Sequence, residues 1–205
     1  TTRAQAERLL LAGATPADVD GAMRAFGFAM GPFEAQDLGG LDIAAFQRQA
    51  ALARGETVFA PVAERLCAAG RLGQKTKAGW YDYPEGSRQG QASPVVESEI
   101  AKARAAAGFV TRSFTQSEIL DAFLLPMVNE GACILQEGIA KRAVDIDLVK
   151  IHGYGFPRWQ GGPMHWGMAQ GLPVVVEKLD QLAAQNMATP VCDYLRSRSE
   201  NAQPL

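Results

Sequence analysis

The sequence contains little of the chemistry that marks an independent enzyme. Its three cysteines are odd in number and far apart, so they predict neither a disulfide framework nor a metal-ligand spacing. We expect free thiols packed in the helices of a reduced protein. Each of the two histidines lacks a partner at the spacing of a zinc site. A structural role is therefore expected for Cys67, Cys133, Cys192, His152 and His165.

Charge of one sign and long apolar runs are also lacking. The 20 Lys and Arg residues are balanced by 22 Asp and Glu residues, and the net charge of −2 provides no field to attract nucleic acid or an anionic membrane. No run approaches the roughly 18 apolar residues of a membrane span. The segment from Thr1 to Arg8 is polar where a signal peptide is apolar, and it lacks an initiator Met, so we expect a processed or truncated product.

A nucleotide-binding loop is missing as well. Gly153-Tyr154-Gly155 has the first two glycines of a dinucleotide fingerprint, but that motif needs a third glycine three residues later, between a strand and a helix. The position holds Arg158, and the residues before the motif are predicted to be helical. The sequence therefore predicts no cradle for a pyrophosphate.

The sequence is rich in residues that begin and end helices. Thr15-Pro16 provides an N-cap and a first-turn proline, apolar residues follow at helical spacing, and Gly27 ends the helix. The capping box Thr115–Glu118 begins a long apolar helix that runs to Gly138. Strand signals are weak: residues 79–83 and 173–176 are candidates, and helical spacing follows the second at once. We predict an all-α fold.

A degenerate internal repeat runs through the chain. An acidic-capped helix, a Gly-Phe pair and a Gly-Pro loop occur twice in the same order, roughly 125 residues apart. Between the copies, the Pro84–Pro94 stretch has the composition of a linker or exposed loop. Two related helical units joined by a linker are predicted from three matched pairs: Asp18-Val19-Asp20 with Asp145-Ile146-Asp147, Gly27-Phe28 with Gly155-Phe156, and Gly31-Pro32 with Gly162-Pro163.

Two features leave alternatives open. Gly31-Pro32-Phe33 and Gly162-Pro163-Met164 fit sharp turns between packed helices, and Met, Phe and Pro beside a kinked backbone also fit the lining of an apolar acyl pocket. The run Arg71–Lys77 holds three cations within seven residues. It fits a solvated loop, and equally a contact with a neighbouring domain or with a phosphate-bearing substrate such as CoA.

Three groups of segments together resemble the C-terminal domains of 3-hydroxyacyl-CoA dehydrogenases. Each segment alone is a weak signal, but their order and spacing cover nearly the whole chain. The first group lies within Val19–Asp42, the second within Gly70–Tyr83, and the third comprises Pro126–Glu130, Glu137-Gly138, Gly155–Pro157 and Gly161–Pro163.

The resemblance implies a fold and a domain organisation. The fold is two related helical domains of the 6-phosphogluconate dehydrogenase C-terminal-like type, with residues 1–83 as the first, 84–112 as linker and connecting helix, and 113–205 as the second. Duplication of the helical domain is similar to the multifunctional fatty-acid β-oxidation enzymes. Those enzymes also carry an enoyl-CoA hydratase and an NAD-binding Rossmann domain.

The resemblance also implies where the chemistry lies. The family oxidises the 3-hydroxyl of an acyl-CoA with NAD, using His, Glu and Ser of the Rossmann domain and an Asn that would fall upstream of Thr1. Asp121 stands at the matching position of the second copy, and Asn129 falls at a different helical position. We therefore expect no catalytic, NAD-binding or metal-binding residue here, an inactive fragment, and substrate contact at Met30 and Phe33.

Two functional hypotheses follow. In the first, the chain is the C-terminal portion of a dehydrogenase, forming a wall of the substrate cleft and packing on its own Rossmann and hydratase domains, in a cytoplasmic, bacterial-type enzyme. Its partners would be acyl-CoA and other copies in a homo-oligomer, with no nucleic acid and no membrane span. In the alternative, it is a non-catalytic oligomerisation or interaction module that reuses the fold.

Overall fold

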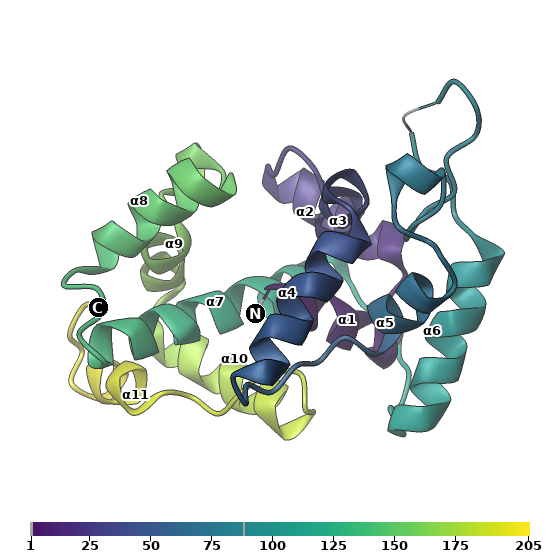
Figure 1. Cartoon of the computed structure of the whole chain (residues 1–205). Coiled ribbons are helices and arrows are strands. Elements are labelled where there is room, and N and C mark those ends of the chain that lie inside the picture. The colour runs from purple at the N-terminus through teal and green to yellow at the C-terminus, as the bar shows by residue number, and fades with distance from the viewer. Residues whose placement is uncertain (1, 88) are drawn as a thin grey trace. The chain divides into compact units, whose positions relative to one another are not determined.

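The computed structural model describes residues 2–87 and 89–205 (Figure 1). Thr1, where the N-terminal prediction begins, and Arg88, inside the expected loop, lie outside the described residues. Within the described part the chain is helical, which confirms the all-α prediction. The α-helices are α1 (Thr2–Ala12), α2 (Pro16–Phe26), α3 (Pro32–Gly39), α4 (Leu41–Ala53), α5 (Pro61–Ala68), α6 (Pro94–Ala107), α7 (Gln116–Gln136), α8 (Ala143–Tyr154), α9 (Pro163–Gln170), α10 (Leu172–Ala184) and α11 (Asp193–Glu200), with 3₁₀ turns η1 (Gln74–Thr76) and η2 (Arg158–Gln160).

The chain divides into two compact units. The first unit consists of the residues up to Arg24 together with Met30–Gln116, and the second consists of Ala25–Ala29 together with Ser117–Leu205. Helix α6, which the sequence placed in the connecting segment, contacts α1 and α5 of the first unit. The boundaries at 83 and 113, and the common origin of the two units, stay predictions.

Proline and glycine mark the helix ends as expected. Proline opens α3, α5, α6 and α9 near the first helical position, where its missing N–H removes no helical hydrogen bond. Gly108 and Gly155 follow α6 and α8 in the left-handed conformation that glycine adopts without steric cost. Of the two strand candidates, residues 173–176 lie in α10, and residues 79–83 take part only in isolated β-bridges within the described residues.

Helix α1 is the centre of the first unit. Leu9, Leu10 and Leu11 are all fully buried, so more than one side of this helix is covered. The Arg104 side chain on α6 donates hydrogen bonds to the carbonyls of Leu10 at 2.8 Å and Ala14 at 3.1 Å. These bonds tie α6 to the C-terminal end of α1 and to the residues that follow it.

Helix α7 is 21 residues long and lies almost wholly in the second unit. It runs through Pro126 without a break, and Leu124, Leu125 and Val128 around the proline are buried. Asp121 pairs with Lys178 on α10 at 2.6 Å. Among the described residues, no helix combines the length and the apolar character needed to cross a membrane.

Candidate functional site

The loop that the sequence singled out, Met30–Phe33, is held from beneath by a buried carboxylate. Asp20 on α2 is fully buried, and its two oxygens accept the backbone N–H of Phe33 at 2.9 Å and of Glu34 at 3.1 Å. These N–H groups belong to the first turn of α3, where the helix provides no acceptor of its own. Asp20 therefore fixes the entry of the loop into α3.

Gly31 is required by this close approach. A Cβ atom on Gly31 would lie 2.1 Å from an Asp20 carboxylate oxygen, well inside contact distance. The Gly31 N–H donates to the Glu34 carboxylate at 2.9 Å, and Glu34 also pairs with Arg24. The loop is thus fixed by both of its neighbouring helices.

A tyrosine completes the cluster around Asp20. The Tyr81 hydroxyl donates to Asp20 at 2.7 Å. Burial raises the pKa of Asp20 to about 6, although its hydrogen bonds with Phe33 and Tyr81 oppose the shift. Burial, and then the charge of Asp20, raise the pKa of Tyr81. The cluster holds helices together, and both groups are already used by structural hydrogen bonds.

The two predicted substrate contacts, Met30 and Phe33, lie in different environments. Phe33 is fully buried, with its ring 4.5 Å from the ring of Trp80 between centroids. Met30 is 38% exposed at the outside of the loop. In this structure Phe33 offers no surface to a ligand, so an acyl contact through this loop would fall to Met30.

The cationic run is tied into the first unit by hydrogen bonds and ion pairs. Arg71 is 9% exposed and donates to the Gly79 carbonyl at 2.9 Å and to Asp82 at 2.6 Å. Lys75 pairs with Asp42 at 2.5 Å, and Lys77 pairs with Glu85 at 3.3 Å. All three cations therefore have carboxylate partners within the chain.

Sequence reasoning missed a second buried carboxylate, Asp37 on α3. It accepts the backbone N–H groups of Trp80 at 2.8 Å and Tyr81 at 3.0 Å, and the hydroxyl of Tyr83 at 2.9 Å. Burial is the main cause that raises its pKa. Residues 79–83 are rich in glycine and aromatic residues, and this composition was the available signal. Because the segment belongs to no helix, its backbone N–H groups need acceptors from elsewhere in the chain.

The second unit repeats the Asp20 arrangement at its matched position. Asp147 on α8 accepts the backbone N–H of Met164 at 2.7 Å and of His165 at 3.1 Å, in the first turn of α9. A Cβ atom on Gly162 would lie 2.4 Å from the Asp147 side chain. In both units an aspartate on one helix therefore accepts hydrogen bonds from the first turn of a later helix. The glycine just before that later helix leaves room for the aspartate.

We expect Gly162→Ala to destabilise the second unit by about 2 kcal/mol, because Gly162 has φ +98° and its Cβ would collide with Asp147. Gly153→Ala is the matched control: Gly153 lies inside α8, and an added Cβ would have no neighbour within 4 Å. That change should leave stability equal or slightly higher, since alanine favours helix. Urea unfolding measures both variants, and equal midpoints would contradict the expected collision.

The two Gly-Phe pairs of the repeat meet inside the second unit, to which residues 25–29 belong. The rings of Phe28 and Phe156 pack edge-to-face with centroids 5.4 Å apart, and Phe26 packs against Phe156 at 5.8 Å and Trp166 at 6.2 Å. Edge-to-face aromatic pairs add to the stabilisation from burial. These phenylalanines therefore serve packing.

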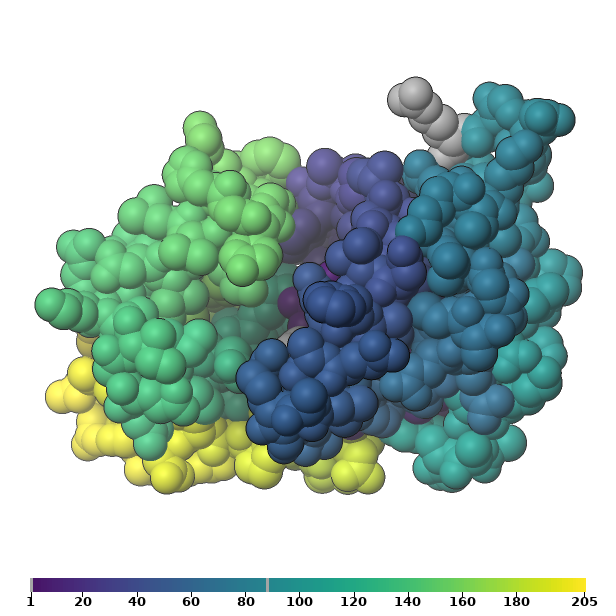
Figure 2. All heavy atoms as spheres, in the orientation of Figure 1, coloured from purple at the N-terminus to yellow at the C-terminus, as the bar shows by residue number. Residues whose placement is uncertain are grey.

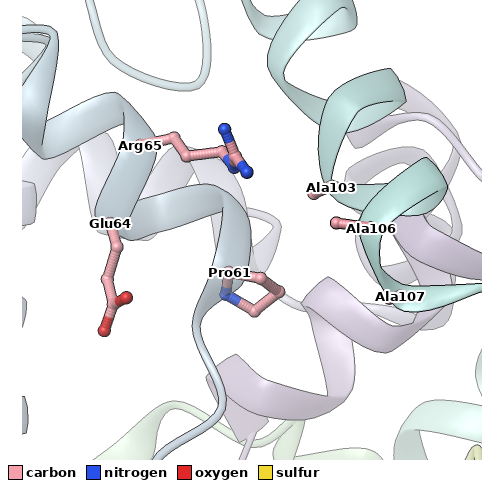
Figure 3. Close-up of a pocket in the computed structure, with 6 residues that line it drawn as sticks. All are labelled: Pro61, Glu64, Arg65, Ala103, Ala106 and Ala107. Carbon is pink, nitrogen blue, oxygen red and sulfur yellow. The ribbon is translucent and has the colours of Figure 1, made fainter.

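A shallow depression of about 390 Å³ lies between α5 and α6 of the first unit (Figure 3). Its α6 side is formed by alanines, and its α5 side carries Arg65, which points toward α6, and Glu64, which points away. Arg65 is 3.7 Å from Glu99. The floor offers few polar groups to orient a ligand.

Polar residues elsewhere also have structural partners. Asn129, which the sequence argument left without a catalytic role, is 2% exposed and hydrogen-bonds to the Pro190 carbonyl at 3.0 Å and the Cys192 N–H at 2.8 Å. Across residues 2–87 and 89–205, no group of three or more His, Cys, Asp or Glu side chains is placed to hold a metal ion.

Comparison with known proteins assigns this arrangement of helices. Residues 2–83 match the family model described as 3-hydroxyacyl-CoA dehydrogenase, C-terminal domain. Residues 2–83 form a 3-hydroxyacyl-CoA dehydrogenase C-terminal domain. The loop at Met30, the Asp20 cluster and the Asp37 cluster all belong to this dehydrogenase domain.

Relatives extend the similarity beyond the dehydrogenase C-terminal domain. The chain is 38% identical to the peroxisomal bifunctional enzyme of Pongo abelii, over 98% of this chain and 30% of that protein. It is 37% identical to the fatty acid oxidation complex subunit alpha of Idiomarina loihiensis, over 88% of this chain and 25% of that protein. The chain therefore spans less than a third of the length of either relative.

A solved structure shows the same fold. The dehydrogenase part of multifunctional enzyme 1 from C. elegans superposes with a TM-score of 0.72 at 26% identity, covering 94% of this chain and 44% of that one. The 3-hydroxybutyryl-CoA dehydrogenase of Escherichia coli superposes equally well at 20% identity, which indicates a shared fold. The resemblance inferred from the sequence is confirmed.

Proposed function

We propose that this chain forms the helical C-terminal portion of an NAD-dependent 3-hydroxyacyl-CoA dehydrogenase of fatty-acid β-oxidation, where it supplies a wall of the substrate cleft and a packing surface for other domains. The observation that carries the proposal is the match of residues 2–83 to the dehydrogenase C-terminal domain, with relatives aligned along nearly the whole chain. Closing such a wall over the substrate would exclude water and hold the hydroxyl carbon in position for oxidation.

The proposed division of labour rests on how the polar residues are used. Asp20, Asp37, Asp147 and Asn129 are all buried and bonded to backbone groups or tyrosine hydroxyls. A general base has to reach a proton on the substrate, which these side chains do not. The chain therefore fits a scaffold, with the reacting groups on other polypeptide of the enzyme.

The Gly153-Tyr154-Gly155 segment does not fit the pyrophosphate of NAD. Gly153 and Tyr154 end α8, and Gly155 is its left-handed C-cap, so the glycines follow a helix instead of opening one. A pyrophosphate site needs N–H groups at a helix N-terminus after a glycine-rich turn. We propose that NAD is bound by a Rossmann domain outside this chain.

Exposed apolar side chains support the packing role. On and around α8, large apolar residues face solvent although they would normally be buried: Ile139, Val144, Leu148, Val149, Tyr154 and Trp159. This segment is coloured green in Figure 2, where it lies at the surface of the second unit. Large apolar side chains exposed within one segment support an interaction site there, and other domains of the same enzyme are the proposed partners.

Two measurements test the proposal. The purified chain should give no change in NADH fluorescence at micromolar concentration and should not oxidise 3-hydroxyacyl-CoA. When the chain replaces the matching region of a peroxisomal bifunctional enzyme, the chimera should oxidise the substrate. Tight NADH binding by the chain alone, or a folded but inactive chimera, would reject the proposal.

In that chimera, Met30→Asp should raise KM for a long-chain 3-hydroxyacyl-CoA roughly tenfold, because a charge would replace apolar contact with the acyl chain. Leu38→Asp is the matched control, since Leu38 is 59% exposed on α3 of the same domain. An unchanged KM for Met30→Asp would remove Met30 from the substrate contacts while leaving the wider function in place.

The alternative, a non-catalytic oligomerisation module, gives a different result. A module that pairs through the α8 face would form a stable dimer on its own, and light scattering on the purified chain would show it.

A cytoplasmic, bacterial-type setting is part of our proposal, and the relatives carry both peroxisomal and bacterial names.

A further inference from the structure

Two cysteines meet where α11 begins on the side of α7. Asn129, Cys133 and Gln136 follow one another at i, i+4 and i+7 on α7, so they share one face of that helix. The Asn129 side chain accepts the backbone N–H of Cys192 at 2.8 Å, and the Gln136 side chain accepts the Cys192 thiol at 3.4 Å. Cys133 lies between these two contacts, one turn from each, and therefore faces Cys192.

The two thiols are close enough to influence each other. Burial, and then hydrogen bonding with the Cys192 thiol, raise the pKa of Cys133 to about 12. Both cysteines are free thiols, with Cys133 partly buried and Cys192 9% exposed. Cys192 is also the N-cap residue of α11.

We propose that Cys133 and Cys192 form a redox site, closing a reversible disulfide between α7 and the start of α11 when the chain meets a peroxide. This site is separate from the proposed dehydrogenase function, which uses neither thiol. Residues beside both sulfurs hold the two segments together before any bond forms, so the reaction needs little backbone movement.

The chemistry divides between the two sulfurs. The Cys192 thiolate attacks one peroxide oxygen, the O–O bond breaks, and Cys192 becomes a sulfenic acid as the other oxygen leaves as water after protonation. The Cys133 sulfur then attacks the Cys192 sulfur, the S–O bond breaks, and a second water leaves with the Cys133 proton. In sum, two thiols are oxidised, one hydrogen peroxide is reduced, and one disulfide and two waters form.

The order of attack follows from the surroundings. As part of the proposal we assign the first reaction with peroxide to Cys192, because the surroundings of Cys133 disfavour its thiolate. Once Cys192 carries a neutral sulfenic acid, the repulsion of its charge no longer opposes ionisation of Cys133. Cys133 then acts as the resolving thiol at very high effective concentration.

Cys67 provides an internal comparison. It lies on α5 in the first unit, where its thiol is 3.6 Å from the Leu41 carbonyl and 3.8 Å from Arg48. It is partly buried, like Cys133, but belongs to the other compact unit. Cys67→Ser therefore removes the third thiol without touching the proposed pair.

The experiment treats the full chain carrying Cys67→Ser with a small excess of hydrogen peroxide. Intact mass should fall by two hydrogen atoms, both remaining thiols should become inert to alkylation, and digestion should yield one peptide pair linked through Cys133 and Cys192. Dithiothreitol should restore the thiols. The bridge closes a loop of roughly 60 residues, so Tm should rise by roughly 5 °C or more.

The controls separate a prepared site from chance oxidation. In Cys133→Ser no bridge should form, and Cys192 should either stay alkylatable or become over-oxidised. In the parent, the bridge should form at least tenfold faster in buffer than in concentrated urea. A bridge that forms as fast in urea, that links different molecules, or that never forms while sulfinic acid accumulates would overturn the proposal.

Discussion

Asp20→Ala is expected to lower the free energy of unfolding of the first unit by about 4 kcal/mol. The change removes the acceptor for three donors, the N–H groups of Phe33 and Glu34 and the hydroxyl of Tyr81. Each buried donor left without a partner costs about 1–3 kcal/mol. Three such donors would cost about 3–9 kcal/mol together, and because the Glu34 bond is only part-buried we expect a loss in the lower part of that range.

The loss should be largest where Asp20 acts. Hydrogen exchange of the α3 amides should accelerate on the order of a thousandfold, since 1.4 kcal/mol corresponds to a factor of ten. Urea unfolding followed by Trp80, which is buried against Phe33, reports the same unit. A Trp159→Phe, Trp166→Phe background isolates the Trp80 signal.

The matched controls differ in how many buried donors they release. Asp18→Ala, two residues earlier and exposed, removes only the two hydrogen bonds that the Asp18 carboxylate accepts from Thr15 at the start of α2, and it should cost about 1 kcal/mol. Asp147→Ala in the second unit removes the acceptor of two backbone N–H groups. Its loss of unfolding free energy should lie between those of Asp18→Ala and Asp20→Ala. If Asp20→Ala is no more harmful than Asp18→Ala, the buried carboxylate does not hold α3.

Glu7 is expected to make the protein less stable as the pH rises from about 4.5 to about 7. This side chain on α1 is 1% exposed and accepts the N–H groups of Val62 at 2.8 Å and Ala63 at 3.3 Å, at the start of α5. Burial raises its pKa from 4.5 to about 7, although those hydrogen bonds oppose the shift.

The direction follows from proton binding in the two states. Between pH 4.5 and 7 the unfolded chain has lost the Glu7 proton and the folded chain still holds it, so folding takes up a proton. The stabilisation is present below pH 4.5 and is lost as the pH passes through 7. A shift from 4.5 to about 7 corresponds to about 3 kcal/mol.

Glu7→Gln tests this directly. Glutamine keeps an acceptor oxygen and does not ionise, so the difference in unfolding free energy between pH 4.5 and pH 8 should change by about 3 kcal/mol relative to the parent. Glu97→Gln, an exposed carboxylate in the first turn of α6, is the control and should leave the pH profile unchanged. Parallel pH profiles for Glu7→Gln and the parent would contradict the prediction.

The site was only partly visible in the sequence. The Met30–Phe33 loop and its second-unit counterpart were recognisable, because glycine and proline at fixed offsets specify backbone geometry. Which member of the loop reaches solvent was not, and Phe33 proved to be core packed on Trp80, more than forty positions away. Burial depends on what packs against a side chain, and local spacing does not contain that information.

The cationic run shows the same limit. Three cations in seven residues are compatible with solvent, a neighbouring domain or a phosphate. In the folded chain, Arg71 bonds to Gly79 and Asp82, and Lys75 reaches Asp42 on another helix. Partners far apart in sequence decide the role of a charge, because Coulomb energy depends on distance in space.

By itself, the sequence determined the all-helical class, many helix ends and the family, since each depends on residues within a few positions of one another or on ordered motifs. The tertiary structure alone decided that Glu7 and Asp37 are buried acceptors, that Asp20 and Asp147 play matched parts, and that Cys133 faces Cys192. A buried carboxylate or a thiol pair consists of groups that come together only when helices distant in sequence pack. How those helices pack depends on the apolar contacts of the whole unit and not on local spacing.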